Sequence, residues 1–193
     1  MTPAAEGTGV PDLTFRHYDT GGARAARGTV ALIHRDAYAD AIASGDPFAS
    51  HEAFMRRFDA HTRHPSLDLV LAYADDEPAG QAWGWPEDAG DADLRTETTG
   101  GTEPGFPDEN RIFALAEIMV RKAWTGQGVA HALHDALLAA RTERRAELYV
   151  RPANVNAYRA YLRWGWRKAG ETRPDLPDAP LFDVLVLPLP LTR

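Results

Sequence analysis

Residues 113–140 change their pattern at a pair of glycines, and this change constrains the fold more than any other feature of the chain. Residues 113–120 form an apolar run with one charged residue, at a length that suits a β-strand. From Val129 onward, apolar residues recur at helical spacing. Between them lies Gly126-Gln127-Gly128, where glycine permits a positive φ and leaves no Cβ in the way of a ligand. Because free N–H groups at a helix start favour an anion, the pattern predicts a strand, a phosphate-binding turn and a helix.

Two common phosphate-binding motifs do not match this turn. The G-x-x-x-x-G-K-[ST] loop needs a lysine where the chain has Val129. The dinucleotide motif G-x-G-x-x-G needs a third glycine where His131 stands. Taken alone, the two glycines are equally compatible with an ordinary turn between a strand and a helix.

Two blocks together resemble the GNAT acyltransferase superfamily. Thr125-Gly126-Gln127-Gly128-Val129-Ala130 resembles its acetyl-CoA-binding motif [Q/R]-x-x-G-x-[G/A], and Val120 closes the preceding strand. The chain departs from the motif at Thr125, where the family usually has Gln or Arg. Residues 154–166 resemble the family pattern N-x-x-A-x-x-x-Y-x-x-x-G-F, with Trp166 in place of Phe. The resemblance implies an α/β (α+β) GNAT fold, in which a central mixed, mostly antiparallel sheet has helices on both faces.

The resemblance also implies acetyl-CoA as the co-substrate and a set of residues that bind it. Backbone N–H groups of Ile118, Met119 and Val120 would bind the pantetheine arm and the acetyl carbonyl. Asn154 would contact CoA through its side chain, and it can cap a helix at the same time. The implied CoA-binding residues are Ile118, Met119, Val120, Thr125, Gly126, Gln127, Gly128, Val129, Ala130, His131, Asn154 and Ala157.

Glu117 and Tyr161 are the candidate catalytic residues. Acetyl transfer needs a base for the attacking amine and an acid for the departing thiolate. Tyr161 occupies the family's tyrosine position, whereas Tyr158 on the same helix has no motif support. Glu117 is a lone carboxylate in an apolar strand, on the same face as Met119, which suggests that it faces a wet cleft. The resemblance implies that an acidic base on this strand usually acts through water. The alternatives are a core aromatic for Tyr161 and a solvent-facing or salt-bridged side chain for Glu117.

A subfamily comparison favours Glu117 as the base. Enzymes that acetylate the N-termini of ribosomal proteins resemble this chain around Asn154 and Tyr161. They carry a glutamate base five residues before that Asn, where this chain has Tyr149. The sequence therefore argues against a direct copy of their mechanism.

Composition restricts the class of protein. The chain has 193 residues, which suits a single domain, here assigned to residues 13–193 after a disordered tail at 1–12. It has no cysteine, which excludes disulfides and thiolate chemistry, and its net charge of −7 disfavours nucleic-acid binding. Without a signal peptide or a long apolar run, we expect a cytoplasmic protein with no membrane partner.

Periodicity predicts the remaining elements. Strands are expected at residues 13–18, 67–73, 81–85, 146–150 and 181–187, and helices at residues 25–42, 50–61 and 154–164. The acidic segment 87–110 is expected to be a flexible loop. It is either a lid that favours a cationic acceptor or an insertion with no role.

Other polar and aromatic residues give weaker indications. The pairs His61/His64 and His131/His134 have spacings that a metal could use, but no nearby carboxylate completes a set, and no metal site is predicted. Trp83 and Trp85 share a strand face, where core packing is favoured over a role in an acceptor pocket.

The favoured function is an acetyl-CoA-dependent N-acetyltransferase acting on a primary amine of a small molecule. One alternative is a protein N-terminal or lysine acetyltransferase, which needs an open groove for a peptide. Another is a catalytically silent acyl-CoA-binding module. The sequence leaves the acceptor, the acyl length and the oligomeric state open, and a homodimer is compatible with it.

Overall fold

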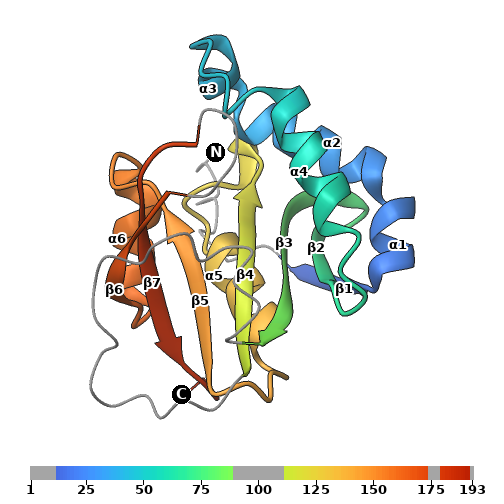
Figure 1. Cartoon of the computed structure of the whole chain (residues 1–193). Coiled ribbons are helices and arrows are strands. Elements are labelled where there is room, and N and C mark those ends of the chain that lie inside the picture. Colours follow the sequence, from blue (N-terminus) through green and yellow to red (C-terminus); the bar gives the residue numbers. More distant parts are fainter. Residues whose placement is uncertain (1–11, 89–110, 174–178, 192–193) are drawn as a thin grey trace, which may run out of the picture.

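The computed structural model describes residues 12–88, 111–173 and 179–191. Seven strands form one sheet within these residues, in the order β1-β2-β3-β4-β5-β7-β6 (Figure 1). The strands are β1 (Leu13–Tyr18), β2 (Asp68–Ala74), β3 (Glu77–Asp88), β4 (Arg111–Val120), β5 (Arg145–Val150), β6 (Arg167–Thr172) and β7 (Phe182–Pro188). Only the β4–β5 pair is parallel, so the sheet is mixed and mostly antiparallel, as predicted.

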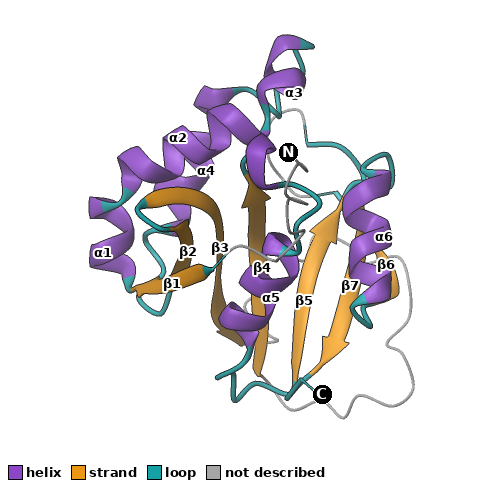
Figure 2. Ribbon diagram, turned by 180° about the vertical axis from the view of Figure 1, so that it is seen from behind, coloured by secondary structure: helices purple, strands orange, loops and turns teal. Residues whose placement is uncertain are grey.

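Helices cover both faces of the sheet. They are α1 (Thr20–Ala25), α2 (Arg27–Ala37), α3 (Ala39–Ala43), α4 (His51–His61), α5 (Val129–Leu138) and α6 (Val155–Arg163), with a 3-10 turn, η2 (Lys122–Trp124), before α5. Figures 1 and 2 show α1, α2 and α4 on one face and α5 and α6 on the other. Asn154 caps α6 as expected, and Ser50 caps α4, since each side chain accepts a hydrogen bond from an N–H of the first turn.

Each face of the sheet has its own hydrophobic core. On the face of α5, Val129, Leu133 and Leu137 belong to the core in which α5 packs against β2, β3 and β4, which confirms the apolar stripe read from the sequence. On the other face, Phe54 and Phe58 of α4 pack with Trp83 of β3. These two cores hold β4 in the middle of the molecule.

A bulge in β4 changes the expected alternation of its side chains. The register with β3 shifts, so that Trp83 pairs with Glu117 while Gly84 pairs with Leu115, and Ala116 is the extra residue. Glu117 and Met119 lie on the face of α4 as predicted. Ala116 packs on that same face, whereas strict alternation along the strand would place it with Ile118 and Val120 on the other face.

The parallel pair of β4 and β5 separates after a short contact. Pairing is limited to residues 112–114 of β4 and 145–147 of β5, and the strands then diverge (Figure 1). From Leu115 to Val120, β4 has no strand partner on its β5 side. The carboxyl ends of both strands therefore border a gap in the sheet.

Three boundaries differ from the sequence expectations. The helix expected at 25–42 is divided into α2 and α3 at Tyr38, and a separate short helix, α1, precedes α2. The apolar spacing continues across the division, but the backbone dihedral angles of Tyr38 are not helical. Strand β3 runs from Glu77 to Asp88 and so is longer at both ends than the expected 81–85; Glu87 and Asp88, expected in the loop, belong to the strand. Strand β6 was missed because it is an edge strand that buries one residue, Thr172, and has no apolar alternation.

Parts of two predictions lie outside the described residues. These are the expected tail, apart from Asp12, and the acidic loop beyond Asp88. In the part of the chain that is described, no helix is long and apolar enough to cross a membrane.

Candidate active site

The glycine turn before α5 has the geometry of an anion cradle. Gly126 and Gly128 have φ values of 76° and 82°, and a Cβ at either position would meet no atom within 4 Å. Gly128 is the N-cap of α5 and no side chain caps the helix. The first backbone hydrogen bond of α5 runs from the Ala132 N–H to the Gly128 carbonyl, so the N–H groups before it have no acceptor within the helix. The turn is thus open to a phosphate group.

Two side chains of the turn donate hydrogen bonds to backbone carbonyls just before it. Thr125 Oγ1 donates to the Lys122 carbonyl at 2.8 Å, and Gln127 Nε2 donates to the Ala123 carbonyl at 2.8 Å. Thr125 therefore supports the backbone at the position where the family usually has Gln or Arg.

Gly128→Ala should weaken CoA binding by roughly tenfold, because the cradle depends on a left-handed residue that costs an L-amino acid about 1 to 2 kcal/mol. Isothermal titration with CoA measures the change. Gly45→Ala is the matched control, since Gly45 has a φ of 77° and equally open surroundings but lies between α3 and α4. Both variants should lose similar thermal stability. Equal CoA affinity in both would contradict the cradle.

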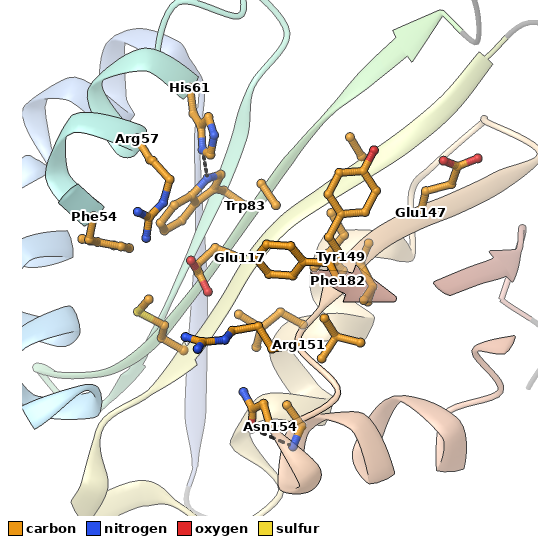
Figure 3. A pocket seen from close by; sticks show the side chains of 18 of the residues that line it. Phe54, Arg57, His61, Trp83, Glu117, Glu147, Tyr149, Arg151, Asn154 and Phe182 are labelled. Carbon is orange, nitrogen blue, oxygen red and sulfur yellow. Dashed lines mark hydrogen bonds between the residues drawn. The ribbon is translucent and has the colours of Figure 1, made fainter. Parts of the chain in front are cut away.

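A cavity of about 230 Å³ lies where β4 and β5 separate. Its walls come from both faces of the sheet: Phe54, Arg57 and His61 of α4 line one part, and Ala157 and Tyr161 of α6 line another. Figure 3 shows Glu117 of β4 between the α4 side chains and those of β5 and β7. The cavity therefore connects the two faces through the gap.

Glu117 lies inside this cavity and keeps part of its surface accessible. Burial raises the pKa of its carboxyl group to about 7, although the charge of Arg57 and a hydrogen bond from the Ile118 N–H oppose the rise. A carboxylate whose pKa lies near neutrality suits a general base. Within the described residues the side chain lies in the cavity, with intermediate burial, and forms no salt bridge.

Tyr161 lines the same cavity from α6, and its ring packs against Trp164 and Trp166. Burial, and next the charges of Glu117 and Tyr38, raise the pKa of its hydroxyl above the ordinary value. The hydroxyl therefore keeps its proton at neutral pH and suits a proton donor. Tyr158 differs, because its hydroxyl donates to Asp183 at 2.8 Å and it does not line the cavity.

The predicted CoA-binding residues fall into two groups. Ile118, Met119, Asn154 and Ala157 line the cavity. The others lie outside its lining: Val120, Thr125, Gly126, Gln127, Gly128, Val129, Ala130 and His131. Of these, residues 125–131 form the cradle and the first turn of α5, and Val120 packs on the core of that face. The edge of β4 that has no strand partner runs between the residues that line the cavity and those of the glycine turn.

Sequence reasoning missed Tyr38 and Arg57, which also line the cavity. Tyr38 lies at the junction of α2 and α3, and the charge of Glu117 raises the pKa of its hydroxyl. Arg57 shares a face of α4 with Phe54 and His61, at spacings of three and four residues. For Arg57, the sequence signal that could have indicated a site residue is a cation on the aromatic face of a helix. For Tyr38, no sequence motif indicates such a role.

Trp83 and Trp85 are core residues, the role favoured from the sequence, and are exposed to only 1% and 3%. Both also line the cavity. His61 Nδ1 accepts a hydrogen bond from Trp83 Nε1 at 3.2 Å, and the ring of His64 stacks on Trp85. The first histidine pair thus packs against these two tryptophans.

The second histidine pair lies close to a carboxylate, in a cluster of His131, His134 and Asp135. Both ring nitrogens of His134 are already engaged, because Nδ1 contacts Asp135 at 2.9 Å and Nε2 accepts from Trp166 Nε1 at 3.0 Å. The ring of His131 stacks on that of Trp164. These contacts explain the cluster as packing between α5 and the end of α6.

Solved structures share the fold at low sequence identity. An acetyltransferase of the GNAT family from Streptococcus agalactiae has a TM-score of 0.68 at 13% identity, covering 92% of this chain and 96% of that one. Arabidopsis thaliana NAA60, in complex with a bisubstrate analogue, has a TM-score of 0.62 at 15% identity, covering 93% and 99%. The aminoglycoside N-acetyltransferase AAC(6')-Iy, in complex with CoA, has a TM-score of 0.57 at 14% identity, covering 88% and 95%.

None of the curated protein sequences matches the chain significantly. The family model for the acetyltransferase (GNAT) family matches residues 34–166, which include β4, the glycine turn, α5 and α6. The described sheet has the mixed topology expected for that family. The chain therefore belongs to the GNAT family and is an N-acetyltransferase.

Proposed function

We propose that the protein transfers an acetyl group from acetyl-CoA to a primary amine of a small molecule, with Glu117 as the base, acting through water, and Tyr161 as the acid. The observation that carries the proposal is the position of the two side chains. They come from opposite faces of the sheet and line one cavity, where β4 and β5 separate.

The residues present fit CoA. The open cradle before α5 suits its phosphates, and the unpaired edge of β4 offers backbone groups to the pantetheine arm. Asn154 lines the cavity next to this edge while it caps α6. When bound, acetyl-CoA supplies the activated acetyl group as a thioester.

Glu117 and Tyr161 would carry out separate proton transfers. An ammonium has no lone pair with which to attack, so Glu117, acting through water, takes one proton from the amine before the C–N bond forms. Backbone N–H groups of β4 would stabilise the negative charge that develops on the carbonyl oxygen. As the C–S bond breaks, the Tyr161 hydroxyl gives its proton to the sulfur and the tyrosinate takes the remaining proton from the nitrogen, so the products are an amide and a free thiol.

Contacts across the acceptor side of the cavity favour a small molecule over a peptide. The connection between α3 and α4 lies against β5 and β7: Asp46 Oδ2 accepts from Arg151 Nη1 at 2.6 Å, and the rings of Phe48 and Phe182 lie 5.8 Å apart. A peptide would need an open groove there. An aminoglycoside N-acetyltransferase is among the structural neighbours, which is compatible with a small acceptor.

The catalytically silent module is less well supported. A binding module has no need of a buried carboxylate with a pKa near 7 beside a buried tyrosine hydroxyl. Such perturbed groups are costly to bury and are concentrated at catalytic sites.

Thiol release from acetyl-CoA, measured against amines, amino acids, aminoglycosides, polyamines and short peptides, tests the proposal. We expect turnover with one class of small amine, an acetylated product by mass spectrometry, and loss of turnover in Glu117→Gln and Tyr161→Phe. Turnover with peptides alone would instead support the protein acetyltransferase. CoA binding without turnover on any acceptor would support the silent module.

A further inference from the structure

Arg57 is a cation in the cavity that has no salt-bridge partner in the described part of the chain. Its Nη1 donates to the carbonyl of Phe48 at 3.0 Å, and its guanidinium carbon lies 4.1 Å from the centre of the Phe48 ring. Arg151 also lines the cavity, but it is paired with Asp46. Burial lowers the pKa of Arg57, so its charge is held there at an electrostatic cost.

Aromatic and neutral side chains line the cavity beside Arg57, and the carboxylates whose charges act on it are Glu117 and Asp46. Phe54 stacks on His34, with ring centres 3.8 Å apart, and also contacts Trp83. Burial lowers the pKa of His34 to about 4 and that of His61 to about 3, so both are neutral at pH 7. An anion at this wall would therefore find its counter-charge in Arg57.

Glu117 faces the same space. Figure 3 shows Arg57 and Glu117 directed toward the same part of the cavity, and the charge of each acts on the pKa of the other. An amine placed at Glu117 would thus lie close to the guanidinium. A carboxylate attached near that amine is the group that the planar fork of an arginine binds best.

We propose that Arg57 binds a carboxylate of the acceptor, and that the acceptor is an α-amino acid with an aromatic or large apolar side chain. The inference rests on the proposed function and specifies its substrate class. The amino group meets Glu117, the carboxylate meets Arg57, and the side chain lies against Phe54, Trp83 and Trp85.

Arg57 has a competing role as a residue that only adjusts Glu117. Its positive charge lowers the pKa of Glu117, and this effect would be the same for every amine. A carboxylate-binding role concerns only acceptors that carry the carboxylate. The two roles are therefore separated by the ratio of kcat/KM between matched acceptors.

The kinetic test compares L-phenylalanine with L-phenylalaninamide and phenethylamine. Wild type should prefer phenylalanine by roughly 10- to 100-fold in kcat/KM, as expected for a charge-assisted hydrogen bond in a partly buried site. Arg57→Met should abolish this preference, mainly through KM, and Arg57→Lys should keep part of it. Arg56→Met is the control, since Arg56 is 65% exposed and paired with Glu52; it should keep the wild-type ratio. Equal losses on all three acceptors in Arg57→Met would overturn the proposal.

A binding test separates this inference from the proposed function. Titration of the CoA-bound protein with N-acetylphenylalanine and with N-acetylphenethylamine needs no turnover. Tighter binding of the carboxylate compound by wild type, lost in Arg57→Met, supports the subsite even if acetyl transfer fails. Turnover of amines with no preference for the carboxylate in either test leaves the proposed function standing and overturns the subsite. Circular dichroism and thermal melting establish that each variant is folded.

Discussion

Replacing Glu117 with Gln is expected to lower kcat by roughly 10²- to 10⁴-fold, the range typical for loss of a general base. The substitution keeps the size of the side chain and its place in the cavity, but an amide cannot accept a proton from the attacking amine. Stopped or continuous assays of thiol release measure the effect. A variant with wild-type kcat would show that Glu117 is not the base.

The pH dependence provides a second measure of the same role. Because burial raises the pKa of Glu117 to about 7, the residue is protonated and inactive as a base below that pH. The kcat/KM of wild type should therefore rise as pH increases through about 7 and then level off. Glu117→Gln should lack this rise and gain activity only as the amine itself loses its proton, near pH ~10. A rise at pH 7 that persists in the variant would assign it to another group.

Stability distinguishes a lost base from a damaged fold. The pKa of Glu117 is higher in the folded protein, at about 7, than the reference value of 4.5, so its ionisation opposes folding above pH 7. This electrostatic cost disappears as the pH falls from 7 to 4.5, because in this range Glu117 is protonated in the folded state but still ionised in the unfolded state. Glu117→Gln should thus be more stable than wild type at pH 8, by on the order of 2 to 3 kcal/mol, and similar to it near pH 4. Thermal melts at both pH values measure the difference, and a destabilised variant at pH 8 would contradict the burial of a charged group.

Replacing Tyr161 with Phe should lower kcat by about 10²-fold or more, because the thiolate then leaves without a proton donor. The ring contacts with Trp164 and Trp166 are retained in the variant, so its CoA affinity and its melting temperature should change little. Kinetics of thiol release and CoA titration measure the two effects separately. Unchanged kcat would leave Tyr161 as a core aromatic.

Tyr158→Phe is the matched control on the same helix. It removes a hydroxyl that donates to Asp183, outside the cavity, and Asp183 keeps its ion pair with Lys168 at 2.8 Å. We expect kcat to stay at the wild-type value and stability to fall by about 1 kcal/mol. A loss of kcat equal to that of Tyr161→Phe would mean that the hydroxyl at 161 has no particular role.

Local sequence could predict the parts of the site that depend on short segments. The glycines at 126 and 128 have the positive φ that their residue type favours, and α5 begins directly after them. Apolar periodicity also located α4, α6 and most strands. It did not find β6, because an edge strand with little buried surface carries no apolar pattern, nor the break at Tyr38, which apolar spacing spans without a signal.

The sequence by itself determined the family, the order of the central elements and the glycine turn before α5, and it indicated Glu117 and Tyr161 as candidates, since each depends on neighbours along the chain. Only the tertiary structure decided what surrounds them. The divergence of β4 and β5 leaves space for the cavity, and the bulge places Ala116 on the same face of β4 as Glu117. Arg57 and Tyr38 join Glu117 although they are 60 and 79 residues away in the sequence. Their charge and proton affinity depend on burial among side chains from distant elements, and residue spacing along the chain does not encode that burial.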